Sequence, residues 1–155
     1  NVDLFATVAA VTGRKLGPSE GEDSFNILPA LTGEPGAKVR DHLLIAPLRR
    51  THLSMRKGDW IYIGARGHGG FGAKKVGEHG LGGPAAQLFT GHVNSDIEDG
   101  KIKPDAPNAQ LYNLAKDPYQ KQNVIRSHPK IAEQMKLEMQ SIRSTPTAPH
   151  TALGL

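Results

Sequence analysis

A segment dense in glycine divides this chain into two parts that can each form regular structure. Nine of the twenty residues from 64 to 83 are glycine. Glycine costs more backbone entropy to order than any other residue, and neither helical nor strand periodicity persists in this stretch. We therefore predict a glycine-rich loop over 64–108, which continues through turn residues near 94–107, with regular elements before and after it.

Before this loop, the residue patterns predict two helical segments and three strands. Apolar residues recur at helical spacing up to Val11, and Gly13 follows where a left-handed C-terminal cap is needed. Gly58 separates two short apolar segments, which is typical of a β-hairpin. The predicted elements are a helix over 2–12, a helical turn over 26–33, and strands over 42–46, 53–56 and 60–63.

After the loop, the patterns predict a strand over 110–114 and a helix over about 129–142 that begins at Pro129. The helix has an apolar stripe formed by Ile131, Met135, Met139 and Ile142. The predicted fold class is α+β, with a small antiparallel β-sheet of about four strands packed by the C-terminal helix. We expect one subdomain over 1–143 and a mobile tail over 144–155.

The composition excludes several classes of function. The chain of 155 residues has no cysteine, which removes disulfides, thiolate metal sites and cysteine nucleophiles. The formal net charge is +4, but aromatic residues make up only 5% and no basic run exceeds two residues, so nucleic acid is not expected as a partner. No apolar run reaches about 18 residues and no signal peptide lies within these residues, so we expect no membrane partner.

Four segments follow one another in an order that is known from a protein family. They are Val2–Thr7 (VDLFAT), Asp23–Gly33 (DSFNILPALTG), Arg56–Trp60 (RKGDW), and Gln110–Pro118 (QLYNLAKDP) with the later Asn123 and His128-Pro129. Together they resemble the C-terminal subdomain of sulfatases of the arylsulfatase type, in the alkaline-phosphatase-like superfamily. The chain departs from that pattern at Ala6, Ser24, Asn26 and Ile61, where the family commonly has proline, glycine, serine and lysine.

The resemblance implies that a longer parent enzyme hydrolyses sulfate esters. In the family, the reaction uses a formylglycine made from Cys or Ser in a C/S-x-P-x-R motif, together with a calcium ion, and both lie upstream in the catalytic domain. Ser144 begins a partial match to that motif, but Ala148 stands where arginine is required. A cation is needed there to stabilise the negative sulfate oxygens. We therefore assign no catalytic residue and no metal ligand to this chain, and we expect the chain alone to be inactive.

The resemblance also implies partners and a location. The chain would cap the N-terminal catalytic domain of its own parent, whose substrate would be a sulfated small molecule or glycan. The parent would be periplasmic or secreted. The alternative is a free-standing module that binds polyanions through the basic residues of the glycine-rich loop.

The candidate substrate-binding residues are the basic side chains of that loop, Arg66, His68, Lys74 and Lys75. Backbone N–H groups of glycine-rich loops can hold oxyanions, and basic side chains supply the countercharge. The loop is not a nucleotide-binding Walker loop, because Ala73 separates Lys74 from the preceding glycine and Val76 follows Lys75. An exposed loop without substrate contacts is the simpler alternative.

The polar residues near 94–99 have a faint similarity to a calcium-binding loop. Asp99 stands where such a loop needs glycine, so we expect Asn94, Asp96, Glu98 and Asp99 to be solvated instead. The seven histidines form no His-x-x-x-His pair on a predicted helix. His128 is better explained as a residue that begins the last helix.

Overall fold

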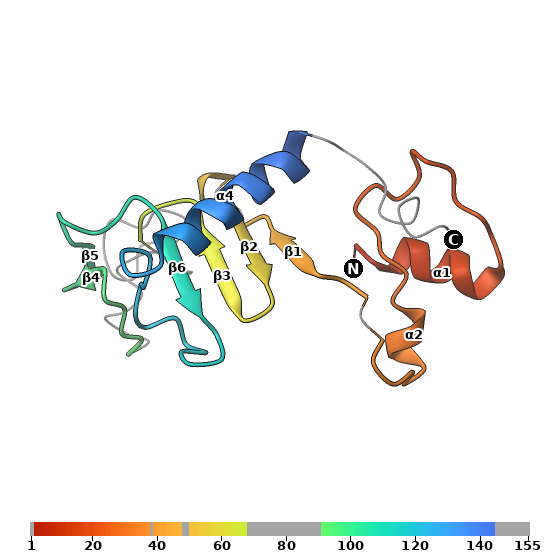
Figure 1. The fold of residues 1–155 in the computed structure, drawn as a ribbon, viewed down its shortest axis with the longest axis horizontal. Coiled ribbons are helices and arrows are strands. Elements are labelled where there is room, and N and C mark those ends of the chain that lie inside the picture. Colours follow the sequence, from red (N-terminus) through yellow and green to blue (C-terminus); the bar gives the residue numbers. More distant parts are fainter. Residues whose placement is uncertain (1, 38, 48–49, 68–90, 145–155) are drawn as a thin grey trace. The chain divides into compact units, whose positions relative to one another are not determined.

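The computed structural model describes residues 2–37, 39–47, 50–67 and 91–144 (Figure 1). The chain forms two compact units. The described residues of the first unit lie within 2–41 and 141–144, and those of the second lie within 42–140. No helix in the described ranges is long and apolar enough to cross a membrane.

The first unit contains two helices, α1 (Leu4–Thr12) and α2 (Leu28–Leu31). Helix α1 ends as predicted, because Gly13 has φ 70° and its N–H donates to the carbonyl oxygens of Ala10 and Ala9. Pro29 lies in the first turn of α2, where its missing N–H costs no hydrogen bond. Both helical segments therefore form where the sequence predicts them.

The second unit is built on one antiparallel sheet of four strands in the order β1-β2-β3-β6. The strands are β1 (His42–Ile45), β2 (Ser54–Lys57), β3 (Trp60–Ile63) and β6 (Gln110–Asn113). A short 3₁₀ helix, η1 (Arg50–His52), precedes β2. Gly58 has φ 55° and turns the chain between β2 and β3, as the hairpin pattern predicts.

Helix α4 (Pro129–Ser144) lies across one face of this sheet (Figure 1). Met135 and Met139 of the predicted stripe are buried, and they share the core with Met55 and Leu111, which are fully buried. At the start of the helix, the His128 ring packs against Trp60 with ring centroids 5.1 Å apart. The predicted α+β fold, with about four strands and a C-terminal helix, is confirmed.

The region predicted as a loop over 64–108 also contains regular structure. Strands β4 (Ile97–Glu98) and β5 (Lys101–Ile102) form an antiparallel pair. Asp99 and Gly100 connect them with positive φ angles of 48° and 69°. Two consecutive residues with positive φ are typical of a type I′ hairpin turn, for which Asp-Gly is a preferred pair. The structure thus departs from the sequence prediction at 97–102.

Candidate functional site

Arg66 is the one predicted substrate-binding residue that lies within the described part of the chain. His68, Lys74 and Lys75 lie outside it, as does the predicted tail over 144–155 except for Ser144, which is the last residue of α4. The Nη2 atom of Arg66 donates hydrogen bonds to the carbonyl oxygens of Lys103 (2.9 Å) and Pro104 (3.0 Å). Its Nε is buried and has no hydrogen-bond partner among the described residues. Arg66 therefore links the residues after β3 to those after β5.

Gln110 holds the backbone that leads into the glycine-rich segment. Its Nε2 donates to the carbonyl oxygens of Ala65 and Gly67, each at 2.7 Å. Its Oε1 accepts a hydrogen bond from the phenol oxygen of Tyr112 at 2.6 Å. Gln110 is only 3% exposed, so these hydrogen bonds are shielded from competing water. Ala65 and Gly67, just before residues 68–90, are thus fixed to strand β6.

Gly67 approaches its neighbours too closely for a side chain. It has φ 62°, and a Cβ at this position would lie 2.5 Å from the Cδ1 and Cγ1 atoms of Ile102. Only glycine meets both conditions without strain. Glycine at this position is therefore required by local packing.

After residues 68–90, Asn94 is fixed to the same strand. Its Nδ2 donates to the Tyr112 phenol oxygen (2.8 Å) and to the carbonyl oxygen of Gln120 (2.9 Å). Burial raises the pKa of Tyr112 to about 12, against a smaller lowering by the hydrogen bond from Asn94. Gln110, Tyr112 and Asn94 thus form one buried chain of hydrogen bonds, which we call the β6 frame. It joins both flanks of residues 68–90.

The expectation that Asn94 and Asp96 are solvated is wrong, because they are only 4% and 5% exposed. The carboxylate of Asp96 accepts hydrogen bonds from Asn123 Nδ2 (2.6 Å) and Ser95 Oγ (3.2 Å). Asn123 Oδ1 in turn accepts from the backbone N–H of Leu111 at 3.0 Å. Each of these polar side chains has hydrogen-bond partners within the protein. Such partners are the usual condition for burying a polar group.

A polar hollow of about 320 Å³ adjoins Asp96 and Asn123. Lys103, Asp105 and Arg126 also line it, and Arg126 donates to the backbone carbonyl of Asp105. Both signs of charge therefore meet in the hollow and largely match one another. This arrangement does not select an anionic or a cationic ligand.

Glu138 on α4 and His42 on β1 place possible metal-binding atoms within 4.8 Å of each other. The Lys57 ammonium lies 2.5 Å from Glu138 Oε1, however. The carboxylate is therefore already paired with a cation that a metal ion would have to displace. We assign no metal site to these residues.

In the first unit, hydrogen bonds to Asp3, just before α1, and to Thr7 within it connect the first two sequence motifs. Asp3 Oδ1 accepts hydrogen bonds from the N–H of Phe25 (2.9 Å) and from the Arg40 guanidinium. Thr7 Oγ1 accepts from the N–H of Ile27 at 3.0 Å. Residues of the Val2–Thr7 motif thus hold the backbone of the Asp23–Gly33 motif.

Ser24 makes the reverse connection, from the second motif to the helix. Its Oγ accepts a hydrogen bond from the N–H of Ala6 at 2.8 Å, and Ser24 is only 2% exposed. Asp3, at the N-cap position, makes no side-chain cap hydrogen bond to its own helix. Ser24 therefore satisfies a donor in the first turn of α1 that the local sequence leaves open.

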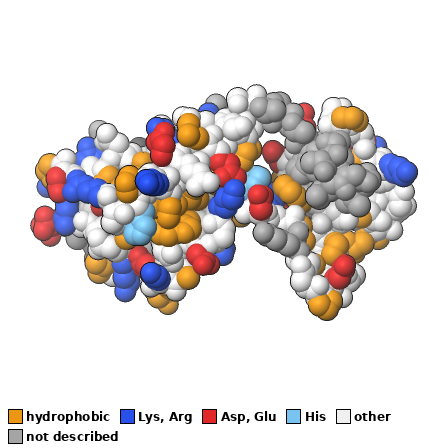
Figure 2. Space-filling model, in the orientation of Figure 1, with side chains coloured by type: hydrophobic (Ala, Val, Ile, Leu, Met, Phe, Trp, Pro, Cys, Tyr) orange, Lys and Arg blue, Asp and Glu red, His pale blue; other side chains and the backbone are white. Residues whose placement is uncertain are grey.

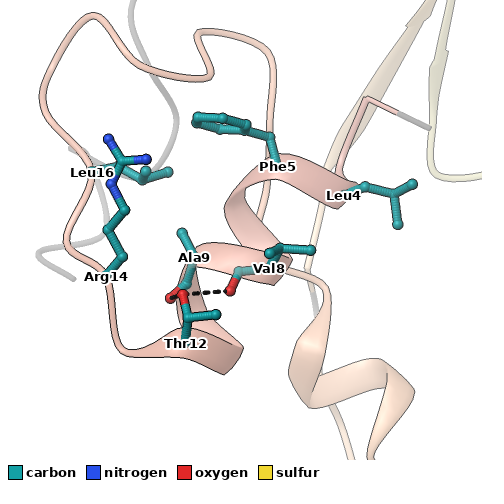
Figure 3. Close-up of a pocket in the computed structure, with 7 residues that line it drawn as sticks. All are labelled: Leu4, Phe5, Val8, Ala9, Thr12, Arg14 and Leu16. Atoms are coloured by element: carbon teal, nitrogen blue, oxygen red, sulfur yellow. Dashed lines mark hydrogen bonds between the residues drawn. The ribbon is translucent and has the colours of Figure 1, made fainter.

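A second hollow, of about 500 Å³, lies along α1 (Figure 3). Leu4, Phe5 and Val8 extend from the helix, and Leu16 and Arg14 come from the segment that follows it. The hollow is predominantly apolar, unlike the one beside Asp96.

Comparisons with known proteins find a sulfatase among the curated sequences and a solved structure of the same fold. No family model matches the chain. The chain is 26% identical over 143 residues to an N-acetylgalactosamine-6-O-sulfatase from Bacteroides thetaiotaomicron. That match covers 92% of this chain and 23% of the relative. The chain thus spans about a quarter of the length of the curated protein that it matches.

A solved structure has the same fold. It comes from work on the metabolism of multiple glycosaminoglycans by Bacteroides thetaiotaomicron, and it superposes with a TM-score of 0.64 at 24% sequence identity. The match covers 92% of this chain and 24% of that chain. The resemblance to a sulfatase predicted from the four sequence motifs is confirmed, and both matches have the extent of a subdomain.

Proposed function

We propose that this chain is the C-terminal subdomain of a sulfatase whose parent hydrolyses sulfate esters. The main support is the homology to a sulfatase over 92% of the chain, in a match that takes up 23% of that relative. Formylglycine and calcium would be held by the upstream catalytic domain, which this subdomain caps. We therefore assign no step of the hydrolysis to the described residues. Neither match supports the alternative of a free-standing polyanion-binding module.

The glycine-rich segment would supply substrate-selecting residues. A sulfate ester is anionic, and basic side chains bind such groups through charge-assisted hydrogen bonds. His68, Lys74 and Lys75 lie in the stretch whose two flanks the β6 frame holds. Held flanks reduce the entropy that the intervening chain loses when it orders on a substrate. Arg66 would contribute by fixing the first flank through Lys103 and Pro104, in addition to any contact with the substrate.

The proposed activity is tested by assaying the full-length parent on sulfated sugars and aryl sulfates. The panel should include 6-O-sulfated N-acetylgalactosamine, because the relative is named for that group. We expect turnover by the parent and none by a purified 1–155 chain. Absence of turnover on every sulfate ester would contradict the proposal, and turnover by the isolated chain would contradict the assignment of catalysis to the upstream domain. The parent is expected in the periplasm or the medium, which cell fractionation would check.

The role of the loop lysines is tested in the same parent enzyme. Replacing Lys74 and Lys75 together with alanine should raise KM more than it lowers kcat, because these side chains would bind the substrate and the transition state alike. The matched control replaces the exposed Lys101 and Lys116 with alanine and should leave both constants unchanged. Unchanged kinetics in the Lys74 and Lys75 variant would show that the segment is an exposed loop.

A further inference from the structure

One face of α1 is apolar, and the described residues of this chain leave about half of its side-chain surface exposed. Leu4, Phe5, Val8 and Val11 are 52%, 48%, 58% and 65% exposed. The opposite side of the helix is packed, since Ala6, Thr7 and Ala9 are buried. The helix sequence LFATVAAVT contains no charged residue. A helix with no charged residue and few polar ones is normally buried, so this exposed face is suited to contact with a partner.

The hollow beside this face adds to the uncovered surface. Val8 and Leu16 line it, and Thr12 at its edge directs its hydroxyl to the carbonyl oxygens of Val8 (3.0 Å) and Ala9 (3.1 Å), as the dashed line in Figure 3 indicates. Arg14 Nη2 at the rim is paired with Glu20 Oε1 at 2.5 Å. The polar groups at the edge are therefore already engaged within the chain. The surface matches an apolar partner rather than a charged one.

Figure 2 shows hydrophobic side chains at the surface of the unit that contains α1 and α2. Leu31 of α2 is itself 66% exposed. Several exposed apolar side chains on one small unit are typical of an interface with another folded body.

We propose that this face of α1 is the surface onto which the upstream part of the parent polypeptide packs, through an apolar patch of its own. The inference rests on the proposed function, which supplies that upstream part. About three quarters of the matched sulfatase lies outside the region that this chain covers, so the parent would have ample material for a cover. Neither side of the contact would need a charged residue.

The size of the face distinguishes this occupant from a second copy of the chain. Partners in a stable complex each bury about 800 Å². One face of a nine-residue helix is too short to provide such an area on its own. A partner in the same polypeptide needs less area, because covalent connection holds it at a high effective concentration.

The test measures whether the face is covered in the full-length parent. Val8→Cys is treated with iodoacetamide under native conditions and in denaturant, and the modified peptide is quantified by mass spectrometry. Residues 1–155 contain no other cysteine, so the peptide reports on this position alone. The control is Leu137→Cys on α4, where the native leucine is similarly exposed at 56%. We expect the native rate at Val8→Cys to fall about tenfold or more below its denatured rate, because a buried thiol is protected from reagents. Equal native and denatured rates would overturn the proposal.

Two further arms identify the cover. The protection should persist on dilution of the parent to the monomer and after deletion of residues 145–155. Loss on dilution would show that a second copy is the cover, and loss on deletion would show that the tail is. Either result overturns the proposal. Protection of Val8→Cys in a parent that hydrolyses no sulfate ester would contradict the proposed function but not this surface. A reactive Val8→Cys in an active sulfatase would contradict the surface but not the function.

Discussion

The side-chain nitrogen of Gln110 lies 2.7 Å from the carbonyl oxygen of Gly67, across 43 positions of the sequence. The same nitrogen also donates to the carbonyl oxygen of Ala65. One side-chain amide on β6 thus fixes the course of the chain as it enters the glycine-rich segment.

Replacing Gln110 with glutamate keeps the shape of the side chain but removes both donated hydrogen bonds. A buried carboxylate oxygen would then face two carbonyl oxygens, so we expect a loss of stability of about 1–3 kcal/mol. The measurement is the urea midpoint of the chain. Gln122→Glu is the control, because Gln122 is exposed. A midpoint shift no larger than that of the control would show that the amide does not hold this backbone.

Gly67→Ala should destabilise the chain by about 1–3 kcal/mol, because it adds backbone strain and a steric clash with Ile102. Gly58→Ala separates these two effects. Gly58 also has a positive φ, 55°, but a Cβ there would meet no atom within 4 Å. Gly58→Ala should therefore show only the loss of stability caused by backbone strain. Ile102→Val should recover part of the loss caused by Gly67→Ala in a double-mutant cycle, and strictly additive effects would exclude the clash.

Tyr112 should make the stability of the chain fall at high pH. Its pKa is about 12 in the folded state, against 10.0 ordinarily. The unfolded chain therefore loses this proton first, so the contribution is complete below pH 10 and is lost as the pH rises towards 12. In that window the contribution falls by roughly 1.4 kcal/mol per pH unit. Tyr112→Phe should show a shallower decline when urea midpoints are compared across this range, although it should be less stable at pH 7 because Asn94 and Gln110 lose a partner. Parallel pH profiles would contradict the assignment.

Ser24→Ala should remove the hydrogen bond that the N–H of Ala6 donates, and cost about 1–2 kcal/mol. Amide exchange at Ala6 should accelerate, because this donor in the first turn of α1 would lose its acceptor. Ser19→Ala is the control, since Ser19 is exposed. Unaltered exchange at Ala6 would show that the helix start does not depend on Ser24.

Helices α1, α2 and α4 and the four strands of the main sheet were predictable because each has a local signal. Glycine at 13 and 58 marks a cap and a turn, and the spacing of Met135 and Met139 identifies the buried face of α4. The Asp99-Gly100 pair was also a local signal, typical of a type I′ turn, but strands of two residues are too short to show periodicity.

The β6 frame and the uncovered face of α1 could not be predicted in this way. Asn94 is buried because of Tyr112, 18 positions away, and Asp96 because of Asn123, 27 positions away. Periodicity reports the spacing of apolar residues within one element and contains no information on such distant partners. For the same reason, the apolar stripe of α1 predicted a helix but did not reveal which side of it the rest of the chain covers.

Gly67 is hydrogen-bonded to Gln110 and Asn94 to Tyr112, and these two side chains of β6 are hydrogen-bonded to each other. The β6 frame therefore does not depend on how many residues connect Gly67 with Asn94. The entropy cost of closing a flexible connection rises by only about 0.6 kcal/mol for each doubling of its length. We therefore expect that the stretch between these two residues can be shortened, lengthened or exchanged for one from another protein while the sheet stays intact. The second unit would then serve as a scaffold for interchangeable inserts, on which specificity for a new ligand can evolve without redesign of the core.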